Sequence, residues 1–285
     1  MIPPDLYALI IRLVAGQDGR LRATQGHLAH AAFLNIIEQV DPALSAALHE
    51  LDGRKPFTIS PLEGYGRGHR GQIQVKGGQE GWLRVTLLDP ALFHTFIHYF
   101  LQGQQRPAIQ LDGFAFHISE ILSTPGSHRL AGYDSLDTLY ERWETADMAA
   151  VNEPINLHFR TPTGFSRRSS HFRHMHILPD PYFVFGELAG YWDRLTGVSW
   201  QEEVRNFAAH CLVVARHEIA SHVYQYRHSK HIGFAGHVTY QIMDITATPH
   251  LRHLQRLADL AFYTGVGSKT TMGMGQVVRK ISEKG

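Results

Sequence analysis

The order of strand and helix signals repeats within this 285-residue chain, and the repeat limits the folds that it can adopt. In the first half, a nearly continuous apolar run from Leu6 to Val14 predicts a strand covered on both faces. Apolar residues then recur at three-and-four spacing, which predicts a helix from a cap at Thr24 to Val40. Asp41-Pro42 supplies the N-cap and first residue of a short helix, Ala43 to Glu50. The remaining expected elements are strands at Phe57 to Leu62, Gly71 to Lys76, Trp82 to Leu88 and Ala108 to Ile121, with a helix from Asp89-Pro90 to about Gln102.

The second half gives the same order of signals. The expected elements are a strand at Ile155 to Arg160, helices at Tyr182 to Leu195 and Ser199 to Leu212, strands at Val213 to Tyr226 and Gly236 to Met243 around a turn at Ser229 to Gly233, a helix at Pro249 to Tyr263 and a strand at Gly275 to Ile281. Two copies of β-α-β-β-α-β predict an α+β protein of two tandem ferredoxin-like domains, each an antiparallel sheet with two helices on one face.

The domain boundary is expected where the periodicity weakens. Between Tyr133 and Asn152 apolar spacing is irregular and acidic residues cluster. The expected organisation is therefore a domain at 1–132, a linker at 133–152 and a second domain at 153–285.

Charge is divided unevenly between the halves. Residues 1–150 carry 12 Lys and Arg against 16 Asp and Glu, a net charge of −4, whereas residues 151–285 carry 15 against 10, a net charge of +5. Because Lys and Arg release counterions when they neutralise phosphates, a polyanionic partner is expected mainly on the second half. Scattered charge without a binding role would give the same balance.

The cysteine content and the first residues of the sequence indicate the cellular compartment that is expected for this chain. The single cysteine, Cys211, cannot form an internal disulfide, which suits a reducing cytoplasm. The initial apolar run is interrupted by Arg12 and lacks a basic segment before it, so it matches neither a signal peptide nor a membrane span.

The 20 histidines raise the question of a metal site. His217 and His222 are five residues apart, whereas the zinc-protease motif requires four, so on a strand they point to opposite faces. His174 and His176 can share a face of a strand, with His228 and His231 as neighbours, but no carboxylate or thiolate spacing completes a ligand set. The spacing therefore predicts no metal and no cofactor, and favours histidines that donate to RNA or stack on it.

A glycine-rich loop lies between the last helix and the last strand. It contains Lys269 and four glycines, Gly265, Gly267, Gly273 and Gly275. A Walker loop requires glycine directly before the lysine, where Ser268 stands, so nucleotide binding of that kind is disfavoured. Glycines let backbone amides approach an anion closely, which favours phosphate contact over the alternative of a tight connection that needs positive φ.

Arginines gather near the start of the second half. Arg160 ends a predicted strand, and Arg167, Arg168 and Arg173 follow it. Guanidinium groups bind phosphate oxygens in a bidentate manner, and Phe165 or Phe172 could stack on a base. A solvated loop is the alternative for this segment.

Three separated segments share a pattern with a known family. They are Asp41 to Glu50 followed by Lys55 to Ser60; the Thr161 to Phe165 turn followed by Pro179 to Phe185 and the helix with Trp192; and Gly233 to Gly236 with the last helix and the glycine-rich loop. In these segments the chain resembles the CRISPR-associated endoribonuclease that cuts repeat RNA into guide RNAs, a member of the RAMP superfamily.

This resemblance implies metal-independent RNA cleavage within a RAMP-type fold. In the implied reaction, the ribose 2′-hydroxyl attacks the phosphorus, and the products end in a 2′,3′-cyclic phosphate and a 5′-hydroxyl. The resemblance places a catalytic histidine at His49 and a supporting lysine at Lys55, which by themselves would be an ordinary surface pair. Some relatives have a tyrosine at the position of Leu34, so the third proton-transfer role is expected at His27 or His30, on one helical face, with Ser60 as a weaker candidate.

Partners and alternatives follow from the same resemblance. The implied partner is CRISPR repeat RNA, with effector-complex proteins and a second copy of the chain as further candidates. A non-cleaving guide-RNA-binding RAMP subunit shares the fold and the basic half, but it has no need of His49 with a lysine six residues later. A metallohydrolase, the third alternative, would carry bound zinc or manganese.

Overall fold

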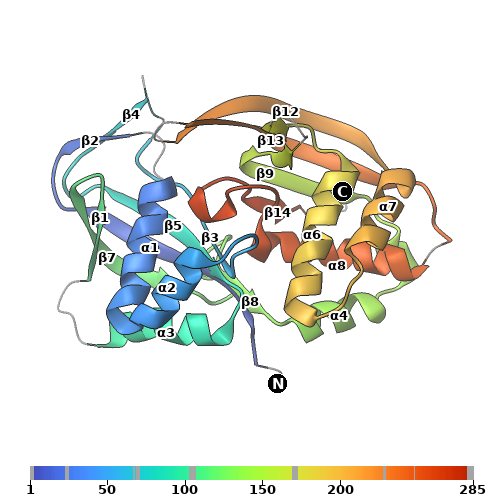
Figure 1. The fold of residues 1–285 in the computed structure, drawn as a ribbon, viewed down its shortest axis with the longest axis horizontal. Coiled ribbons are helices and arrows are strands. Elements are labelled where there is room, and N and C mark those ends of the chain that lie inside the picture. Colours follow the sequence, from blue (N-terminus) through green and yellow to red (C-terminus); the bar gives the residue numbers. More distant parts are fainter. Residues whose placement is uncertain are drawn as a thin grey trace. The chain divides into compact units, whose positions relative to one another are not determined.

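The computed structural model describes residues 3–22, 26–66, 68, 71–102, 107–168, 173–226, 229–246 and 248–280, and Figure 1 shows its helices and strands. The chain forms two compact units. The N-terminal unit comprises Pro3–Asp134 and also Thr271–Gly273, whereas the C-terminal unit is built from Ser135–Thr270 and the described residues from Met274 onward. Three residues of the glycine-rich loop therefore pack with the first half of the chain.

The main sheet of the N-terminal unit has the strand order β3-β5-β1-β7-β6, and all of its neighbouring pairs are antiparallel. Its strands are β1 (Leu6–Ala15), β3 (Phe57–Ile59), β5 (Glu80–Leu87), β6 (Ala108–Leu111) and β7 (Phe114–Leu122). The core of this unit combines the sheet with helices α1 (Gly26–Val40) and α3 (Pro90–Leu101), whose Phe33, Ile37 and Phe96 are buried. This is the predicted β-α-β-β-α-β order.

Three smaller strands complete this unit. β2 (Gly19–Arg22) pairs with β4 (Gln72–Val75) as a separate ribbon, and β8 (Gly132–Asp134) pairs with β1. The prediction of a single strand from Ala108 to Ile121 is wrong, because this segment forms a hairpin of two strands, β6 and β7. Asp112 and Gly113 form its two-residue turn with φ of 53° and 82°, the conformation that Asp-Gly favours between strands.

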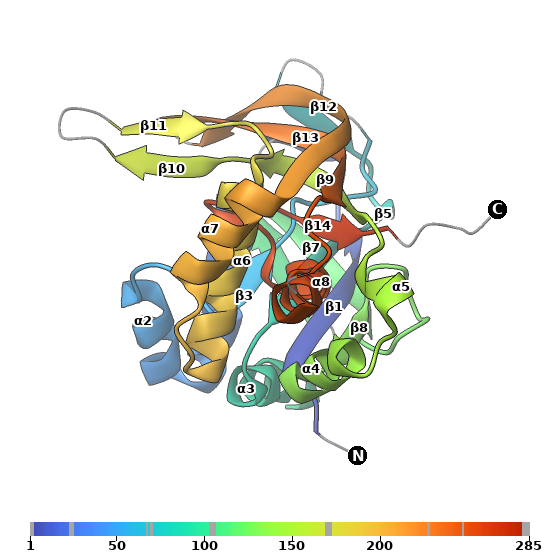
Figure 2. The same cartoon turned by 90° about the vertical axis from the view of Figure 1, so that its right-hand side faces the viewer.

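The C-terminal unit repeats this arrangement with the strand order β12-β13-β9-β14. Its strands are β9 (Ile155–Thr163), β12 (Leu212–Tyr226), β13 (Ser229–Ile242) and β14 (Val277–Arg279), and its helices are α6 (Pro181–Thr196), α7 (Gln201–Cys211) and α8 (Thr248–Thr264). Figure 2 shows β9, β12 and β13 above these helices. The predicted α+β class and the repeated ferredoxin-like order are confirmed.

Two segments of this unit differ from the sequence-based expectation. Residues 229–233, predicted as a turn, belong to β13 and pair with β12 as far as Tyr226 and Ser229. A second hairpin, β10 (Phe165–Arg168) with β11 (Arg173–His176), was not predicted. The expected closing strand from Gly275 begins at Val277, and Ile281 lies outside the described residues.

The segment predicted as a linker contains two helices, α4 (Leu136–Glu144) and α5 (Met148–Val151). The Ser135 hydroxyl caps α4 by accepting a hydrogen bond from the backbone amide of Thr138 at 3.0 Å. Leu139 and Val151 are buried, and both helices pack on α8. Part of this segment therefore contributes to the core of the C-terminal unit.

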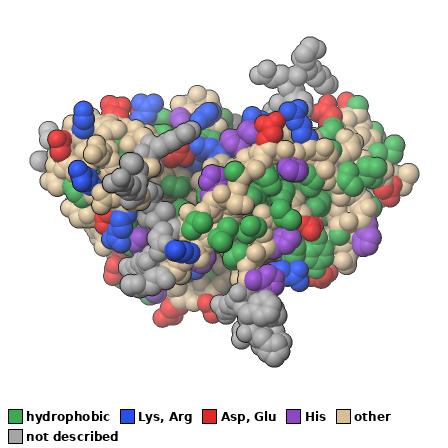
Figure 3. All heavy atoms as spheres, turned by 90° about the horizontal axis from the view of Figure 1, so that it is seen from above, with side chains coloured by type: hydrophobic (Ala, Val, Ile, Leu, Met, Phe, Trp, Pro, Cys, Tyr) green, Lys and Arg blue, Asp and Glu red, His purple; other side chains and the backbone are tan. Residues whose placement is uncertain are grey.

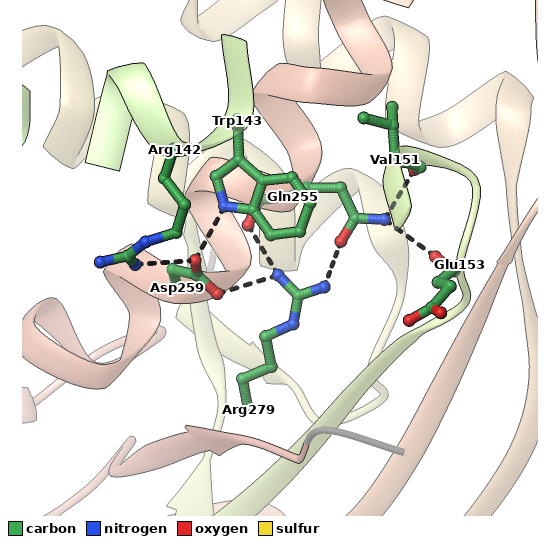
Figure 4. A network of polar contacts seen from close by, with 7 residues as sticks. All are labelled: Arg142, Trp143, Val151, Glu153, Gln255, Asp259 and Arg279. Carbon is green, nitrogen blue, oxygen red and sulfur yellow. Dashed lines mark hydrogen bonds and ion pairs between the residues drawn. The ribbon is translucent and has the colours of Figure 1, made fainter. Parts of the chain in front are cut away.

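A polar network joins α4 to α8 and β14, as Figure 4 shows. Asp259 accepts from the Trp143 indole at 2.8 Å and from the Arg279 guanidinium at 2.9 Å, and Arg142 lies 3.3 Å away. The buried Gln255 amide donates to the backbone carbonyls of Val151 and Glu153, each at 2.8 Å. This network holds the two short helices against the unit.

Removal of the central carboxylate should weaken the unit. Asp259→Ala leaves the largely buried Arg279 guanidinium and the Trp143 indole without their shared acceptor, so we expect the free energy of unfolding to fall by about 2 kcal/mol. Urea denaturation followed by tryptophan fluorescence measures the change. The exposed Glu141→Ala on α4 is the matched control and should change stability by less than about 0.5 kcal/mol.

His253, on α8, is a buried histidine surrounded by tryptophan and arginine side chains. Its side chain is 3% exposed, its ring lies edge-on to Trp192 and Trp200, and its Nδ1 lies 3.1 Å from Arg256 Nη1. Burial, and secondarily the positive charge of Arg256, lowers the pKa of His253 to about 3. The ring is therefore neutral in the folded protein at neutral pH and accepts a hydrogen bond from Arg256.

This low pKa predicts acid destabilisation. Above about pH 6.5 the ring is neutral in both folded and unfolded chains, whereas between about pH 6.5 and 3 only the unfolded chain binds the proton. The His253 contribution to the free energy of unfolding should therefore fall by about 1.4 kcal/mol per pH unit as the pH decreases below 6.5. Urea denaturation at pH 7 and pH 5 should show a smaller loss for His253→Gln than for the native chain, and an equal loss would contradict the assignment.

No helix among the described residues is long and apolar enough to cross a membrane.

Candidate active site

Helix α2 (Pro42–Glu50) carries His49 at its last turn. Asp41 accepts a hydrogen bond from the Leu44 amide at 2.9 Å, and Pro42 is the first helical residue, as the sequence predicts. The Ser45 hydroxyl donates to the Leu34 carbonyl at 3.1 Å, which fixes α2 beside α1 (Figure 1). Leu48 is buried, so the helix presents the neighbouring His49 side chain to solvent.

Lys55 closes the C-terminal end of this helix. Its Nζ donates to the carbonyl oxygens of Leu48 at 2.5 Å and His49 at 3.0 Å, where helix carbonyls lack backbone partners. Burial lowers the pKa of the Lys55 ammonium, and the negative charge of Asp52 opposes this effect. Lys55 therefore contacts the end of the helix that carries His49 through the backbone carbonyls of Leu48 and His49.

His27 and His30 lie on the buried side of α1. His30 Nδ1 is 3.2 Å from the carbonyl oxygen of Thr271, and the His30 ring lies 5.6 Å from that of Phe57. Because a carbonyl oxygen only accepts, Nδ1 carries the proton in this contact and Nε2 is the basic nitrogen of the neutral ring. No local pattern in the sequence indicates that Thr271, distant in the chain, sets this tautomer.

The two remaining positions from the sequence analysis, Leu34 and Ser60, have different surroundings. Leu34, on α1, is half-buried, and its backbone carbonyl accepts a hydrogen bond from the Ser45 hydroxyl. The Ser60 hydroxyl is buried, donates to the Pro61 carbonyl and accepts from the Arg84 amide, each at 2.8 Å. Ser60 is therefore occupied by local backbone contacts, which leaves His27 and His30 as the stronger candidates.

The glycine-rich loop is shaped by close backbone contacts. All four of its predicted glycines have positive φ. A Cβ atom on Gly275 would lie 2.2 Å from the Val266 carbonyl, and one on Gly265 would lie 2.7 Å from the Gly275 carbonyl. The need for a tight connection thus explains Gly265 and Gly275. Lys269, which is exposed and has a φ of 64°, stays the candidate for the predicted phosphate contact.

Backbone hydrogen bonds join this loop to the end of β9 and to Gly164, which follows β9. The Ser268 amide donates to the Gly164 carbonyl at 2.9 Å, and the Gly275 amide donates to the Pro162 carbonyl at 3.0 Å. The segment Thr161–Phe165, predicted as a turn, instead contains the end of β9, Gly164 and the first residue of β10, and it is adjacent to the glycine-rich loop.

The predicted RNA-binding arginines lie on β9 and the β10–β11 hairpin. The Arg160 amide donates to the Gln276 carbonyl at 2.8 Å, and the exposed Arg167 guanidinium lies 5.0 Å from the centre of the Phe183 ring. Arg168 and Arg173 are cross-strand backbone neighbours. The Phe165 ring is buried and lies 5.4 Å from that of Phe183, so it is not exposed for base stacking, and Phe172 lies outside the described residues.

The histidines considered for a metal site occupy strands. On β12, His217 is paired opposite Val238 of β13, and its sequence neighbour Glu218 is paired opposite His237. A contact that the sequence analysis missed is the stack of His158 and His237, with ring centres 4.0 Å apart. Figure 3 views the molecule from above and shows histidine, lysine and arginine side chains on that face. Within the described ranges, no group of three or more candidate ligands could hold a metal ion; His228 lies outside these ranges.

Two family models match the chain, one in each half. Residues 5–141 match the CRISPR Cas6 N-terminal domain, and residues 157–277 match the CRISPR-associated endoribonuclease Cas6. The chain belongs to the Cas6 family. The family predicted from the three sequence segments is therefore confirmed, and these models cover both sets of candidate residues.

Solved structures of this family have the same fold. The Cas6 (TTHB231) product complex is 27% identical, with a TM-score of 0.81, and the match covers 98% of this chain and 100% of that one. The Thermus thermophilus Cas6 (TTHB231) structure is 26% identical over the same shares, with a TM-score of 0.70. A Cas6 (TTHA0078) product complex, at 22% identity, has a TM-score of 0.72 over 97% of this chain and 99% of that one.

A more distant structure extends the fold comparison. A RAMP protein binding different RNA substrates is 10% identical, with a TM-score of 0.61, over 96% of this chain and 100% of that one. The RAMP-type architecture is therefore confirmed. No curated protein sequence matches the chain.

Proposed function

We propose that this Cas6 family member cleaves CRISPR repeat RNA into guide RNAs without a metal ion, leaving a 2′,3′-cyclic phosphate and a 5′-hydroxyl. The observation that carries the proposal is the exposed His49 on a helix end held by the Lys55 ammonium, within a chain that matches the Cas6 family in both halves. The repeat RNA substrate is supported by the related Cas6 product complexes.

Cleavage by the 2′-hydroxyl requires two proton transfers. A base removes the 2′-hydroxyl proton while its oxygen bonds to phosphorus, and an acid protonates the 5′-oxygen as its bond to phosphorus breaks. We assign one transfer to His49 and the other to a histidine of α1. His30 is the better supported of the two α1 candidates, because its Thr271 contact presents Nε2 as a base, and His27 remains the alternative.

Lys55 supplies positive charge next to His49. Among the described residues, the carbonyls of Leu48 and His49 accept two of its three N–H donors, and the third is proposed to bind a phosphate oxygen. An ammonium in this position would stabilise the negative charge that gathers on the phosphorane oxygens. The same hydrogen bonds also fix the backbone that carries the imidazole.

Substrate binding is assigned to the second half of the chain. Arg160, Arg167, Arg168, Arg173 and Lys269 are proposed to hold phosphates, and the adjacent amides of the glycine-rich loop, at Gly265, Gly267, Gly273 and Gly275, are proposed to contact the backbone of the RNA. The exposed Arg167 and Lys269 support this role most directly. Effector-complex proteins and a second copy of the chain are the proposed protein partners.

Loss of the His49 imidazole should separate cleavage from binding. We expect His49→Ala to slow single-turnover cleavage by about 10²-fold or more, because a proton-transfer group is lost, while the Kd for repeat RNA stays within about twofold. The exposed His94→Ala on α3 is the control and should cleave normally. Equal losses of cleavage and affinity would refute the assignment of His49.

The reaction chemistry has its own test. Cleavage of repeat RNA should persist in EDTA, and end-group analysis should find a cyclic phosphate and a 5′-hydroxyl. A single 2′-deoxy substitution beside the scissile phosphate should abolish cleavage while binding persists, because the nucleophile is missing. Binding without any cleavage of the unmodified RNA would favour the non-cleaving RAMP subunit, and loss of cleavage in EDTA would favour the metallohydrolase.

A further inference from the structure

The outer face of the C-terminal sheet carries a pair of histidines that the proposed function does not use. Along β9, Leu157 and Phe159 are buried in the core, whereas His158 between them is half-buried on the opposite face. His158 is paired with His237 of β13, whose neighbour Val238 is buried in the same way. Helix α8 packs against β9 and β14, and Figure 2 shows the helices below the strands. The two histidines therefore lie on the face that is turned away from the helices.

The imidazole rings of His158 and His237 are stacked on each other. Their centres are 4.0 Å apart, and their planes differ by 19°. Because β9 and β13 are the two central strands of this sheet, the stack lies between the edge strands β12 and β14. In RNA-recognition motifs, aromatic side chains on the face of a four-stranded sheet stack on bases, and imidazole is among the rings on which proteins stack unpaired bases. The position of this stack thus points to a base-binding surface.

The backbone register gives the neighbours of the stack. Glu218 of β12 is paired with His237, and Val278 of β14 is paired with His158. The four side chains form one row across the outer face, because directly paired residues of neighbouring strands lie on the same side of a sheet. On the side of His158 that is away from His237, the row therefore continues with a small aliphatic side chain. A planar base above Val278 would extend the stack of the two imidazoles by one ring.

Cationic side chains surround this row. In the adjacent row, Arg216 of β12 lies at one end and Lys280, which follows β14, lies at the other. Both are exposed, and Arg160 lies two residues after His158 on β9 and so on the same face. Glu218 forms an ion pair with Arg216 at 2.8 Å. The positive charge of the three cations exceeds the charge of this carboxylate, which favours a ligand with phosphate groups.

We propose that the stacked pair of His158 and His237 binds an unpaired nucleotide of the RNA, with its base on the His158 ring above Val278 and its phosphates held by Arg160 and Lys280. This inference rests on the proposed function, since the ligand is the repeat RNA. An unpaired nucleotide fits the site because its base can be splayed out to stack on a side chain, whereas bases within an RNA helix are stacked on one another. The site adds base binding to a half of the chain to which the proposed function assigns phosphate contacts.

Removal of the ring should weaken binding without slowing the chemical step. We expect His158→Ala to raise the Kd for the non-cleavable 2′-deoxy repeat RNA about 10-fold, as for the loss of one base–aromatic stack, while cleavage at saturating protein keeps its native rate. His158→Phe retains a stacking ring and should keep the Kd within about threefold of the native value. His217→Ala is the matched control, because it removes an exposed histidine from the opposite side of β12, and it should change neither value.

A series of abasic RNAs identifies the nucleotide that occupies the site. Each non-cleavable repeat RNA lacks the base of one nucleotide and retains all of its phosphates. At one unpaired position, we expect the missing base to weaken binding to the native chain about 10-fold and binding to His158→Ala less than about twofold, because both changes remove the same contact. If His158→Ala does not fold, His158→Gln, which has a polar side chain without a ring, should give the same results.

Two outcomes would overturn the proposal. One is a native Kd for a folded variant that lacks the His158 ring, and the other is an abasic profile that is the same for that variant and for the native chain. If the native chain binds and cleaves repeat RNA in these cases, only the histidine site is refuted. If the native chain does not cleave repeat RNA, or if His49→Ala cleaves it normally, the proposed function itself fails.

Discussion

In each unit, the order of the strands depends on one central strand that is paired along both of its edges. β1 lies between β5 and β7, and β9 lies between β13 and β14. Because both edges of the central strand are occupied, the chain must leave that strand and return to a non-adjacent position, β3 in one unit and β12 in the other. The connection after β1 is the long one that contains β2, α1 and α2, and it carries His27, His30 and His49.

The local chemistry of helix ends then determines where these side chains lie. Asp41 and Pro42 begin α2 directly after α1, and Lys55 binds the carbonyls at its other end. A cation at a helix C-terminus is favoured by the helix dipole as well as by hydrogen bonding. The ammonium that stabilises the helix is thus kept beside His49, and one residue can serve both stability and the proposed chemistry.

Local signals in the sequence were sufficient for much of this architecture. The Asp-Pro pairs at Asp41, Asp89 and Asp180 each precede a helix in the structure. The predicted elements were wrong where a residue is needed for a long-range contact and not for the local structure. Gly233 suggested a turn, but it lies within β13, where a Cβ atom would be 2.6 Å from the Thr163 amide, so glycine is needed for close strand approach. Helices α4 and α5 were missed because their stability depends on contacts with α8 from much later in the chain.

The candidate site shows the same division between local and long-range information. The resemblance to the family could indicate His49 and Lys55, which belong to one short segment, and the structure adds the hydrogen bond from the Lys55 ammonium to the His49 carbonyl. It could not indicate that the backbone of Thr271 would contact His30, since the two residues are 241 positions apart.

This last contact gives the glycine-rich loop a second role in the proposed mechanism. The loop is held by hydrogen bonds to Pro162 at the end of β9 and to Gly164, and its Thr271 carbonyl determines which nitrogen of His30 carries the proton. A backbone carbonyl cannot be removed by a side-chain substitution, so the tautomer depends on the path of the loop rather than on the identity of Thr271. In the proposed mechanism, the glycines whose positive φ permits this path would act on proton transfer through geometry, even where they make no contact with phosphate.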